Sequence, residues 1–215
     1  MRLYLASTSP ARLATLRAAG IEPTVIDSEV DEDAVVAAWV ARNGPIEAAA
    51  MVELLARAKA EAVVGRLIDG EPIDGFVLGG DSAFELDGVT YGKPHLPEVA
   101  RERWLLQRGR TGHLHSGHWL IDHRSGESAG GAGSVTTTSV RFASNITDDE
   151  IDAYIATGEP LAVAGAFTID SLGAPFITWI DGDPHAVVGL SLAALRELFI
   201  GFGIDWSTLW NRRRL

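Results

Sequence analysis

Short apolar runs and segments with helical periodicity alternate along the chain, which predicts a mixture of buried strands and amphipathic helices. Leu3 to Ala6 and Phe76 to Leu78 are apolar runs of strand length, whereas apolar residues recur at helical spacing between Pro45 and about Arg66. The same criteria predict strands at 23–26, 113–121, 135–142 and 176–180, and helices at 34–42, 97–107, 148–156 and 192–200.

The first strand leads into a clearly marked helix start. Ser9 suits the N-cap, Pro10 suits the first helical position, and Gly20 ends the helix. Ser7, Ser9 and Arg12 therefore lie where free backbone N–H groups and the helix dipole favour a phosphate. An ordinary capped helix is the alternative, and a Ser-Pro start taken alone favours it.

Two further segments each allow a structural and a functional interpretation. The acidic run from Asp27 to Asp33 either complements the dipole of the following helix or holds a divalent cation, since Mg²⁺ prefers carboxylate oxygens together with substrate phosphates. Lys59 falls at the edge of the apolar stripe of the long helix. It either reaches into a cleft or covers the border of the stripe with its methylene groups.

Asp81 follows the apolar run Phe76 to Leu78 and two glycines. We expect the glycines to end the strand and to place Asp81 at its C-terminal tip, where α/β sheets bind ligands. A hairpin at 84–91, turning at Asp87-Gly88, then returns the chain toward Asp81 and delivers Lys93. The alternative is a surface aspartate in a turn and a surface lysine before a proline.

The positions of glycines and histidines allow predictions about two loops and about metal binding. The glycine-rich stretch at 124–134 predicts a flexible turn, and the irregular, apolar stretch at 158–177 predicts a folded loop packed against the cleft. His113 and His115 would share one face of a strand and His118 the other, which argues against a three-histidine metal site.

Composition narrows the class of protein. A chain of 215 residues with 47% hydrophobic and 22% charged residues fits a globular protein with a substantial core. The net charge of −11 argues against long nucleic acid as a partner, and the one dense basic run, Arg212 to Arg214, is expected to be a solvated tail. The sequence shows no membrane span, signal peptide or cysteine, so we expect a cytoplasmic protein with no membrane partner.

Motifs over nearly the whole chain carry a family resemblance. They are LASTSPAR (5–12), EVDED (29–33), LARAKA (55–60), GGDSAFELDGVTYGKP (79–94), ITDDEIDAYIATGEP (146–160), AGAFTIDSLG (164–173) and HAVVGLSLAAL (185–195). Together and in this order they resemble the Maf family of nucleoside triphosphate pyrophosphatases. The resemblance implies hydrolysis of a nucleoside triphosphate to its monophosphate and pyrophosphate with a divalent cation, Mg²⁺ or Mn²⁺.

The same resemblance implies a fold and a site. The fold is a single Maf-like domain over residues 1–215, of α/β class, with a twisted mixed β-sheet, flanking helices and two lobes around a deep cleft, similar to inosine triphosphate pyrophosphatase. Asp81 matches the family's catalytic acidic residue, and Glu32 matches the carboxylate that shares the metal and a water with it. The implied substrate-binding residues are Ser7, Ser9, Arg12, Lys59, Ser82, Lys93 and Asp170.

Three departures from the family pattern concern the substrate. Ala11 replaces the first of two adjacent arginines, Val163 replaces a common lysine, and Asp170 stands where members acting on dTTP and UTP have a glutamine. A carboxylate only accepts hydrogen bonds, so it suits the paired N–H donors of guanine better than uracil or thymine. We therefore expect guanine nucleotides to be preferred. The resemblance to family members that act on 7-methyl-GTP, which carry an acidic residue at this position, extends the expectation to 7-methyl-GTP. The alternative is that Asp170 points to solvent or caps a turn and the enzyme is indifferent to the base.

Other functions are compatible with the same motifs. One is a nucleotide-binding regulator of septum formation and cell division that has no turnover. Asp81 and Glu32 argue against it, because a pure triphosphate binder gains nothing from two acidic groups beside the phosphates. A nucleotidyl-transfer enzyme is a further alternative, and the sequence shows no recognisable acceptor site. The oligomeric state is open, a homodimer included.

Overall fold

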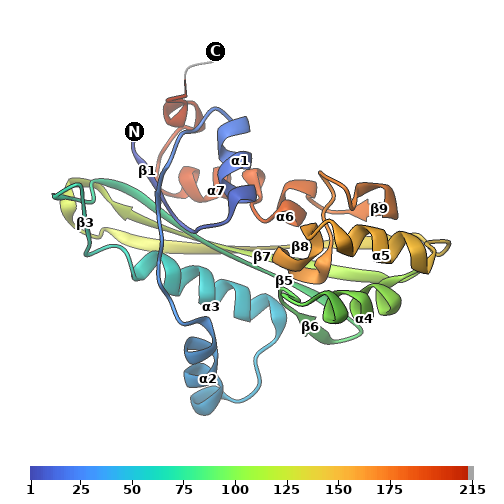
Figure 1. The fold of residues 1–215 in the computed structure, drawn as a ribbon. Helices are drawn as coiled ribbons and strands as arrows, with labels where there is room; N and C mark the ends of the chain where they lie inside the picture. Colours follow the sequence, from blue (N-terminus) through green and yellow to red (C-terminus); the bar gives the residue numbers. More distant parts are fainter. Residues whose placement is uncertain (213–215) are drawn as a thin grey trace. The chain divides into compact units, whose positions relative to one another are not determined.

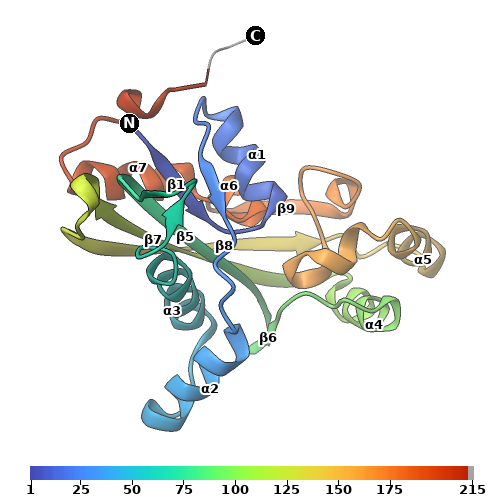
Figure 2. The same ribbon diagram turned by 60° about the vertical axis from the view of Figure 1, so that its left-hand side comes forward.

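The computed structural model describes residues 1–212 (Figures 1 and 2). Its strands and longer helices are β1 (Leu3–Ala6), α1 (Pro10–Ala18), β2 (Thr24–Ile26), α2 (Glu32–Asn43), α3 (Ala48–Glu61), β3 (Leu67–Ile68), β4 (Glu71–Pro72), β5 (Gly75–Leu86), β6 (Val89–Tyr91), α4 (Pro97–Gln107), β7 (Thr111–His123), β8 (Gly130–Phe142), α5 (Asp148–Ala156), β9 (Ile177–Asp181), α6 (Pro184–Val188) and α7 (Leu192–Gly201). Short 3₁₀ helices occur at Arg124–Gly126, Glu159–Ala162, Ala164–Ala166, Ala174–Phe176 and Trp206–Leu209. Most of the predicted basic tail lies outside the described residues.

The central sheet is mixed. Its strand order is β2-β1-β5-β7-β8-β9, with β6 also paired to β5. Strand β1 is parallel to β2 and β5, whereas the β5–β6 and β8–β9 pairs are antiparallel. Strands β3 and β4 form a separate antiparallel pair.

The described chain divides into two compact units. Unit 1 comprises residues 1–81, 116–135 and the chain from residue 189 onward, and unit 2 comprises residues 82–115 and 136–188. Strands β5, β7 and β8 therefore each contribute residues to both units.

Unit 1 is built on strands whose side chains alternate between two apolar cores. Leu3 and Leu5 of β1 belong to the core that contains residues of α1 and α7, whereas Tyr4 and Ala6 belong to the core that contains residues of α3. Figures 1 and 2 show α7 and α3 on opposite sides of the sheet. This is the period-two pattern of a strand buried on both faces. The structure thus confirms the predicted α/β fold with a central mixed sheet and flanking helices.

Unit 2 has one core that is rich in aromatic side chains. Trp104 of α4 packs edge-to-face against Phe142 of β8, with ring centroids 5.5 Å apart, and Phe142 packs in the same way against Phe167. The Trp104 indole N–H donates a 2.7 Å hydrogen bond to the Ala166 carbonyl. Helix α4 thereby holds the irregular stretch that follows α5, because a buried indole N–H requires a partner.

The hairpin between β5 and β6 confirms a prediction made from turn chemistry. Asp87 and Gly88 occupy its turn with φ values of 52° and 77°. Two consecutive positive φ values are typical of a type I′ turn, which favours Asp-Gly. Arg110 forms an ion pair with Asp87.

Two predictions about glycines were wrong. Gly79 and Gly80 do not end the strand, because β5 runs from Gly75 to Leu86, and Asp81 lies in its middle rather than at its tip. The predicted flexible turn is shorter than expected, since β8 begins at Gly130. In both places glycine makes room for a neighbouring group: a Cβ at Gly131 would lie only 2.7 Å from the Trp119 indole nitrogen.

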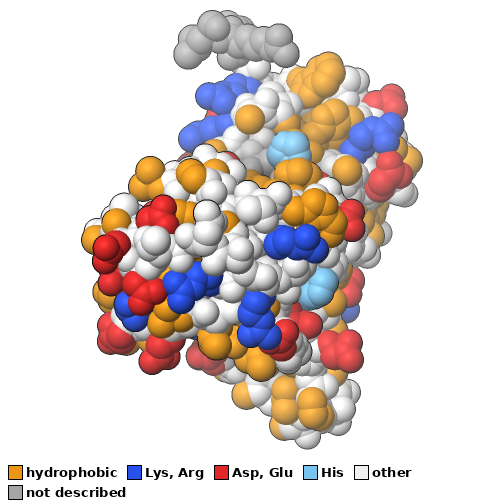
Figure 3. All heavy atoms as spheres, turned by 90° about the vertical axis from the view of Figure 1, so that its right-hand side faces the viewer, with side chains coloured by type: hydrophobic (Ala, Val, Ile, Leu, Met, Phe, Trp, Pro, Cys, Tyr) orange, Lys and Arg blue, Asp and Glu red, His pale blue; other side chains and the backbone are white. Residues whose placement is uncertain are grey.

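Two features of the described residues bear on partners. None of the helices within residues 1–212 is both long and apolar enough to cross a membrane. On the face drawn in Figure 3, Lys and Arg side chains are interspersed with Asp and Glu side chains.

Candidate active site

The start of α1 forms one side of the candidate site in unit 1. Ser9 is the N-cap, and its side chain accepts a hydrogen bond from the Arg12 N–H. The Ser7 hydroxyl accepts hydrogen bonds from the Ser9 N–H at 3.2 Å and from the Arg12 guanidinium at 3.1 Å. The predicted Ser-Pro helix start is confirmed, and its two serines and arginine lie together.

Arg12 is held from two directions although it is charged and buried. Its Nε donates a 2.8 Å hydrogen bond to the Gly189 carbonyl, and only 8% of the residue is exposed. Burial lowers the pKa of Arg12, and the nearby negative charges of Asp81 and Glu32 only partly offset this by raising it. The guanidinium is therefore positioned before any ligand arrives.

Lys59 joins the two predicted acidic residues. Its Nζ lies 2.6 Å from Asp81 Oδ1 and 2.7 Å from Glu32 Oε1. Lys59 lies on α3, Asp81 on β5 and Glu32 at the first turn of α2, so three elements meet at one ammonium group. Lys59 does not extend along the surface to water, as the alternative of a lysine covering the stripe requires, since 8% of the residue is exposed and its ammonium group faces two carboxylates.

Gly79 and Gly80 explain how these side chains come together. A Cβ at Gly79 would overlap the Ala56 carbonyl of α3, and a Cβ at Gly80 would lie 3.1 Å from Arg12 Nε. Successive strand residues face opposite sides, so one glycine admits α3 and the next admits the arginine. Asp81, two residues after Gly79, then faces the α3 side and meets Lys59.

The electrostatic environment of Asp81 is mixed. Burial raises the pKa of its carboxyl group, the positive charges of Lys59 and Arg12 oppose this, and the charge of Glu32 adds to it. A carboxyl group with a raised pKa binds a proton more readily than an exposed aspartate does. Such a group is suited to accept a proton from water.

The other predicted substrate-binding residues belong to unit 2. Ser82 follows Asp81 on β5, Lys93 is exposed just after β6, and Asp170 is exposed in a bend between two 3₁₀ helices. Within residues 1–212, no side chain or backbone group hydrogen-bonds to the Asp170 carboxylate. Their predicted roles rest on the family resemblance.

Sequence reasoning missed the contribution of the segment after α6. The Gly189 carbonyl fixes Arg12, and the Ser191 N–H donates a 3.0 Å hydrogen bond to His118 Nε2. The motif HAVVGLSLAAL was the available signal, but it carried no assigned role. Its contact with Arg12 spans 177 residues of sequence, which local patterns do not reveal.

Two of the histidines of β7 are bonded to the neighbouring strand β8. His113 and His115 contact Ser139 and Thr137 of β8 through their Nδ1 atoms, at 3.2 and 2.9 Å. Within the described residues there is no group of three or more His, Asp or Glu side chains placed to bind a metal ion.

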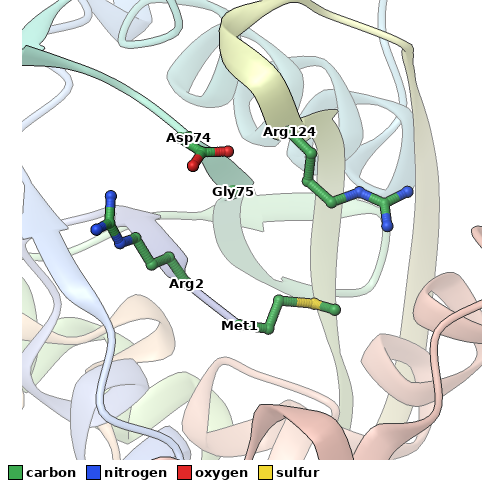
Figure 4. Close-up of a pocket in the computed structure, with 5 residues that line it drawn as sticks. All are labelled: Met1, Arg2, Asp74, Gly75 and Arg124. Atoms are coloured by element: carbon green, nitrogen blue, oxygen red, sulfur yellow. The ribbon is translucent and has the colours of Figure 1, made fainter.

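An open pocket of about 430 Å³ in unit 1 lies among residues other than these. It is lined by Met1, Arg2, Asp74, Gly75 and Arg124, as Figure 4 shows. Arg124 is already paired with Asp122 at 2.6 Å. The pocket contains none of the predicted site residues.

Comparison with known proteins identifies the family. The family described as "Maf-like protein" matches residues 2–202. The chain belongs to the Maf family. The predicted family is thereby confirmed over nearly the whole chain.

Two relatives of this Maf protein carry the same name. The nucleoside triphosphate pyrophosphatase of Leifsonia xyli subsp. xyli is 67% identical over 212 residues, covering 99% of this chain and 98% of its own. The nucleoside triphosphate pyrophosphatase of Salinispora tropica is 50% identical over 212 residues, covering 99% of this chain and 88% of its own. A solved structure of the Staphylococcus aureus Ham1 protein is also similar, with 16% identity, a TM-score of 0.41, and coverage of 67% of this chain and 73% of that one.

Proposed function

We propose that this Maf protein hydrolyses nucleoside triphosphates to nucleoside monophosphate and pyrophosphate. The observation that carries the proposal is the placement of Asp81 and Glu32 on one ammonium group, Lys59, in unit 1. Arg12, Ser7 and the N-terminus of α1 supply groups that suit phosphate oxygens in the same unit. Relatives of 67% and 50% identity are named for this activity.

The chemistry follows from where charge develops. Attack of water on the α-phosphorus breaks the bond to the bridging oxygen, so negative charge grows on the departing pyrophosphate. Lys59 and Arg12 stabilise that charge, and Arg12 needs little reorganisation because Gly189 and Ser7 already hold it. Asp81 orients the water and takes its proton, and its raised pKa suits this role.

A divalent cation, Mg²⁺ or Mn²⁺, is part of the proposal. Asp81 and Glu32 already converge on a positive group, Lys59, so their oxygens suit a cation. An oxygen donor set in a chain without cysteine fits these hard cations. Asp81 and Glu32 would hold the ion, and substrate phosphate and water would supply the remaining ligands. Once bound, such a cation neutralises phosphate charge and positions water.

The family resemblance supports three further substrate-binding residues, Ser82, Lys93 and Asp170, which belong to unit 2. Lys93 matches a basic residue that binds the triphosphate, and Asp170 lies in the segment expected to recognise the base. The acceptor-only carboxylate selects guanine, 7-methylguanine included. We place the reaction in the cytoplasm, where nucleoside triphosphates and Mg²⁺ are both available.

The position of cleavage tests the proposal directly. The purified protein is incubated with GTP, 7-methyl-GTP, UTP and dTTP in ¹⁸O-labelled water with Mg²⁺ or Mn²⁺, and the products are identified by ³¹P NMR and mass spectrometry. We expect pyrophosphate and a monophosphate that carries the ¹⁸O label. Orthophosphate with a nucleoside diphosphate would contradict the proposal. Tight nucleotide binding without any product would favour the regulator of septum formation instead.

A further inference from the structure

Glu159 in unit 2 is surrounded by hydrogen-bond donors. It follows Gly158, which has a φ of 77°, and it opens the 3₁₀ helix Glu159–Ala162. Its carboxylate accepts hydrogen bonds from the hydroxyls of Tyr154 (2.9 Å), Thr168 (2.5 Å) and Ser171 (2.6 Å) and from the N–H groups of Leu172 (3.3 Å) and Gly173 (3.2 Å).

Four of these donors lie in one short stretch of chain, residues 168–173, which we call the Glu159-bound loop. The loop has no strand or α-helix of its own. It also closes on itself, because the Gly173 N–H donates to the Thr168 hydroxyl at 3.2 Å. A Cβ at Gly173 would lie 2.7 Å from the Tyr154 hydroxyl oxygen, so even alanine would displace it.

Asp170 lies between residues that are bonded to Glu159 but is not itself bonded to it. Thr168 on one side and Ser171 on the other are both bonded to Glu159. The Asp170 carboxylate is exposed, and within residues 1–212 it receives no hydrogen bond. The carboxylate at 159 therefore fixes the flanks of Asp170 and leaves its acceptor oxygens available to a ligand.

The anchor is ionised over the whole physiological range. Burial alone would raise the pKa of Glu159, but the hydrogen bonds from Ser171, Thr168, Tyr154 and Leu172 outweigh it and lower the pKa to about 2. Charged acceptors make stronger hydrogen bonds than neutral ones. The contacts of the loop therefore do not change near neutral pH.

We propose that Glu159 is a positioning residue, which holds the Glu159-bound loop so that Asp170 is presented to the base of the bound nucleotide. The inference rests on the proposed function and on the expected role of Asp170. Glu159 does not touch the reacting phosphates in this assignment. Its loss should change base recognition and leave triphosphate recognition intact.

The test compares Glu159→Gln with a matched control, Glu150→Gln. Both replace a carboxylate by an amide of the same shape, and both carboxylates lie in the same unit. Glu150 closes the capping box of α5, where its carboxylate accepts from the Thr147 N–H at 2.8 Å. A purely structural effect should therefore appear as a lower Tm in both variants.

We expect the ratio of kcat/KM for GTP over UTP to fall about tenfold in Glu159→Gln, through KM rather than kcat. The inhibition constant of pyrophosphate, which contains no base, should stay near the wild-type value. The ratio of Kd values for GMP and UMP should fall in parallel. Glu150→Gln should keep the wild-type ratios, and Glu159→Gln added to Asp170→Asn should not change the ratios of Asp170→Asn.

Several outcomes would overturn the inference. One is an unchanged GTP to UTP ratio in Glu159→Gln, with a loss of Tm like that of Glu150→Gln. Another is equal binding of GMP and UMP by the wild-type protein. Absence of turnover in the wild type would count against the proposed function alone, because the GMP and UMP measurements test Glu159 without any reaction.

Discussion

The ammonium nitrogen of Lys59 lies 2.6 Å from a carboxylate oxygen of Asp81, and the side chains are 10% and 11% exposed. The second carboxylate on this ammonium group, Glu32, has a side chain that is 50% exposed. A buried charge requires a partner, whereas an exposed one is solvated by water. Asp81 and Glu32 therefore differ in how exposed they are, and we expect their substitutions to have different effects.

Asp81→Asn should abolish most of the activity while the fold survives. An amide cannot take the proton of an attacking water, so we expect kcat to fall by about a hundredfold or more. Lys59 keeps a hydrogen-bond acceptor at position 81 and its ion pair with Glu32, so the far-UV circular dichroism should be unchanged. Asp122→Asn is the matched control, since it removes another buried carboxylate of unit 1. Wild-type kcat in Asp81→Asn would refute the catalytic assignment.

Glu32→Gln should act on the cation requirement. Loss of one carboxylate ligand weakens cation binding, so the Mg²⁺ concentration that gives half-maximal rate should rise about tenfold, and saturating Mg²⁺ should restore part of the rate. Asp33→Asn removes the neighbouring exposed carboxylate of α2 and serves as the control. Identical Mg²⁺ titration curves for Glu32→Gln and wild type would show that Glu32 is not a ligand.

Local sequence patterns predicted those features of the fold that depend on interactions between residues close together in the chain. The N-cap Ser9 and the hairpin turn at Asp87 depend on interactions within a few residues, and the structure contains both. The family motifs likewise indicated Asp81, Glu32 and Lys59, which unit 1 brings together.

The wrong prediction for Gly79 arose because the conformation of this residue depends on contacts with residues far away in the sequence. The sequence predicts that the strand ends at Gly79, yet parallel pairing of Gly79 with Ala6 continues β5. Because Gly79 has no side chain, α3 can pack closely against β5 at this position. The local sequence pattern does not indicate that contact. The sequence predicts a folded loop at 158–177, but it does not indicate that Glu159 anchors residues 168–173 through hydrogen bonds.

Gly79→Ala should be strongly destabilising. The new Cβ would overlap the Ala56 carbonyl and lie 2.9 Å from the Ala60 nitrogen, so β5 and α3 would have to separate. We expect a loss of about 3 kcal/mol or more in the free energy of unfolding, measured with urea. Gly65→Ala is the control, because a Cβ there would meet nothing within 4 Å. Equal stability of the two variants would contradict the close approach.

The free energy of unfolding should also depend on acid pH through Glu159. Its pKa is about 2 in the folded protein, below the ordinary value of 4.5. Stability from this group is therefore complete above pH 4.5 and is lost as the pH falls toward 2. Urea unfolding at several pH values should show a difference between wild type and Glu159→Gln that shrinks over this interval. A difference that is constant with pH would mean that the carboxylate gains nothing from its hydrogen bonds.

Base selectivity is the most specific consequence of Asp170. Guanine presents N1–H and N2–H groups side by side, which one carboxylate accepts together, whereas uracil and thymine present a single ring N–H flanked by carbonyls. A mismatched polar edge costs about 1 to 3 kcal/mol, so GTP should exceed UTP and dTTP in kcat/KM by about tenfold to a hundredfold.

7-Methyl-GTP retains both donors and should behave as GTP does. Asp170→Asn should lose the preference, because the amide offers a donor where guanine needs an acceptor, while Asp149→Asn, an exposed aspartate of α5, should keep it. Steady-state kinetics with the four nucleotides measures both effects. Equal kcat/KM for GTP and UTP in the wild type, unchanged by Asp170→Asn, would show that Asp170 only faces solvent.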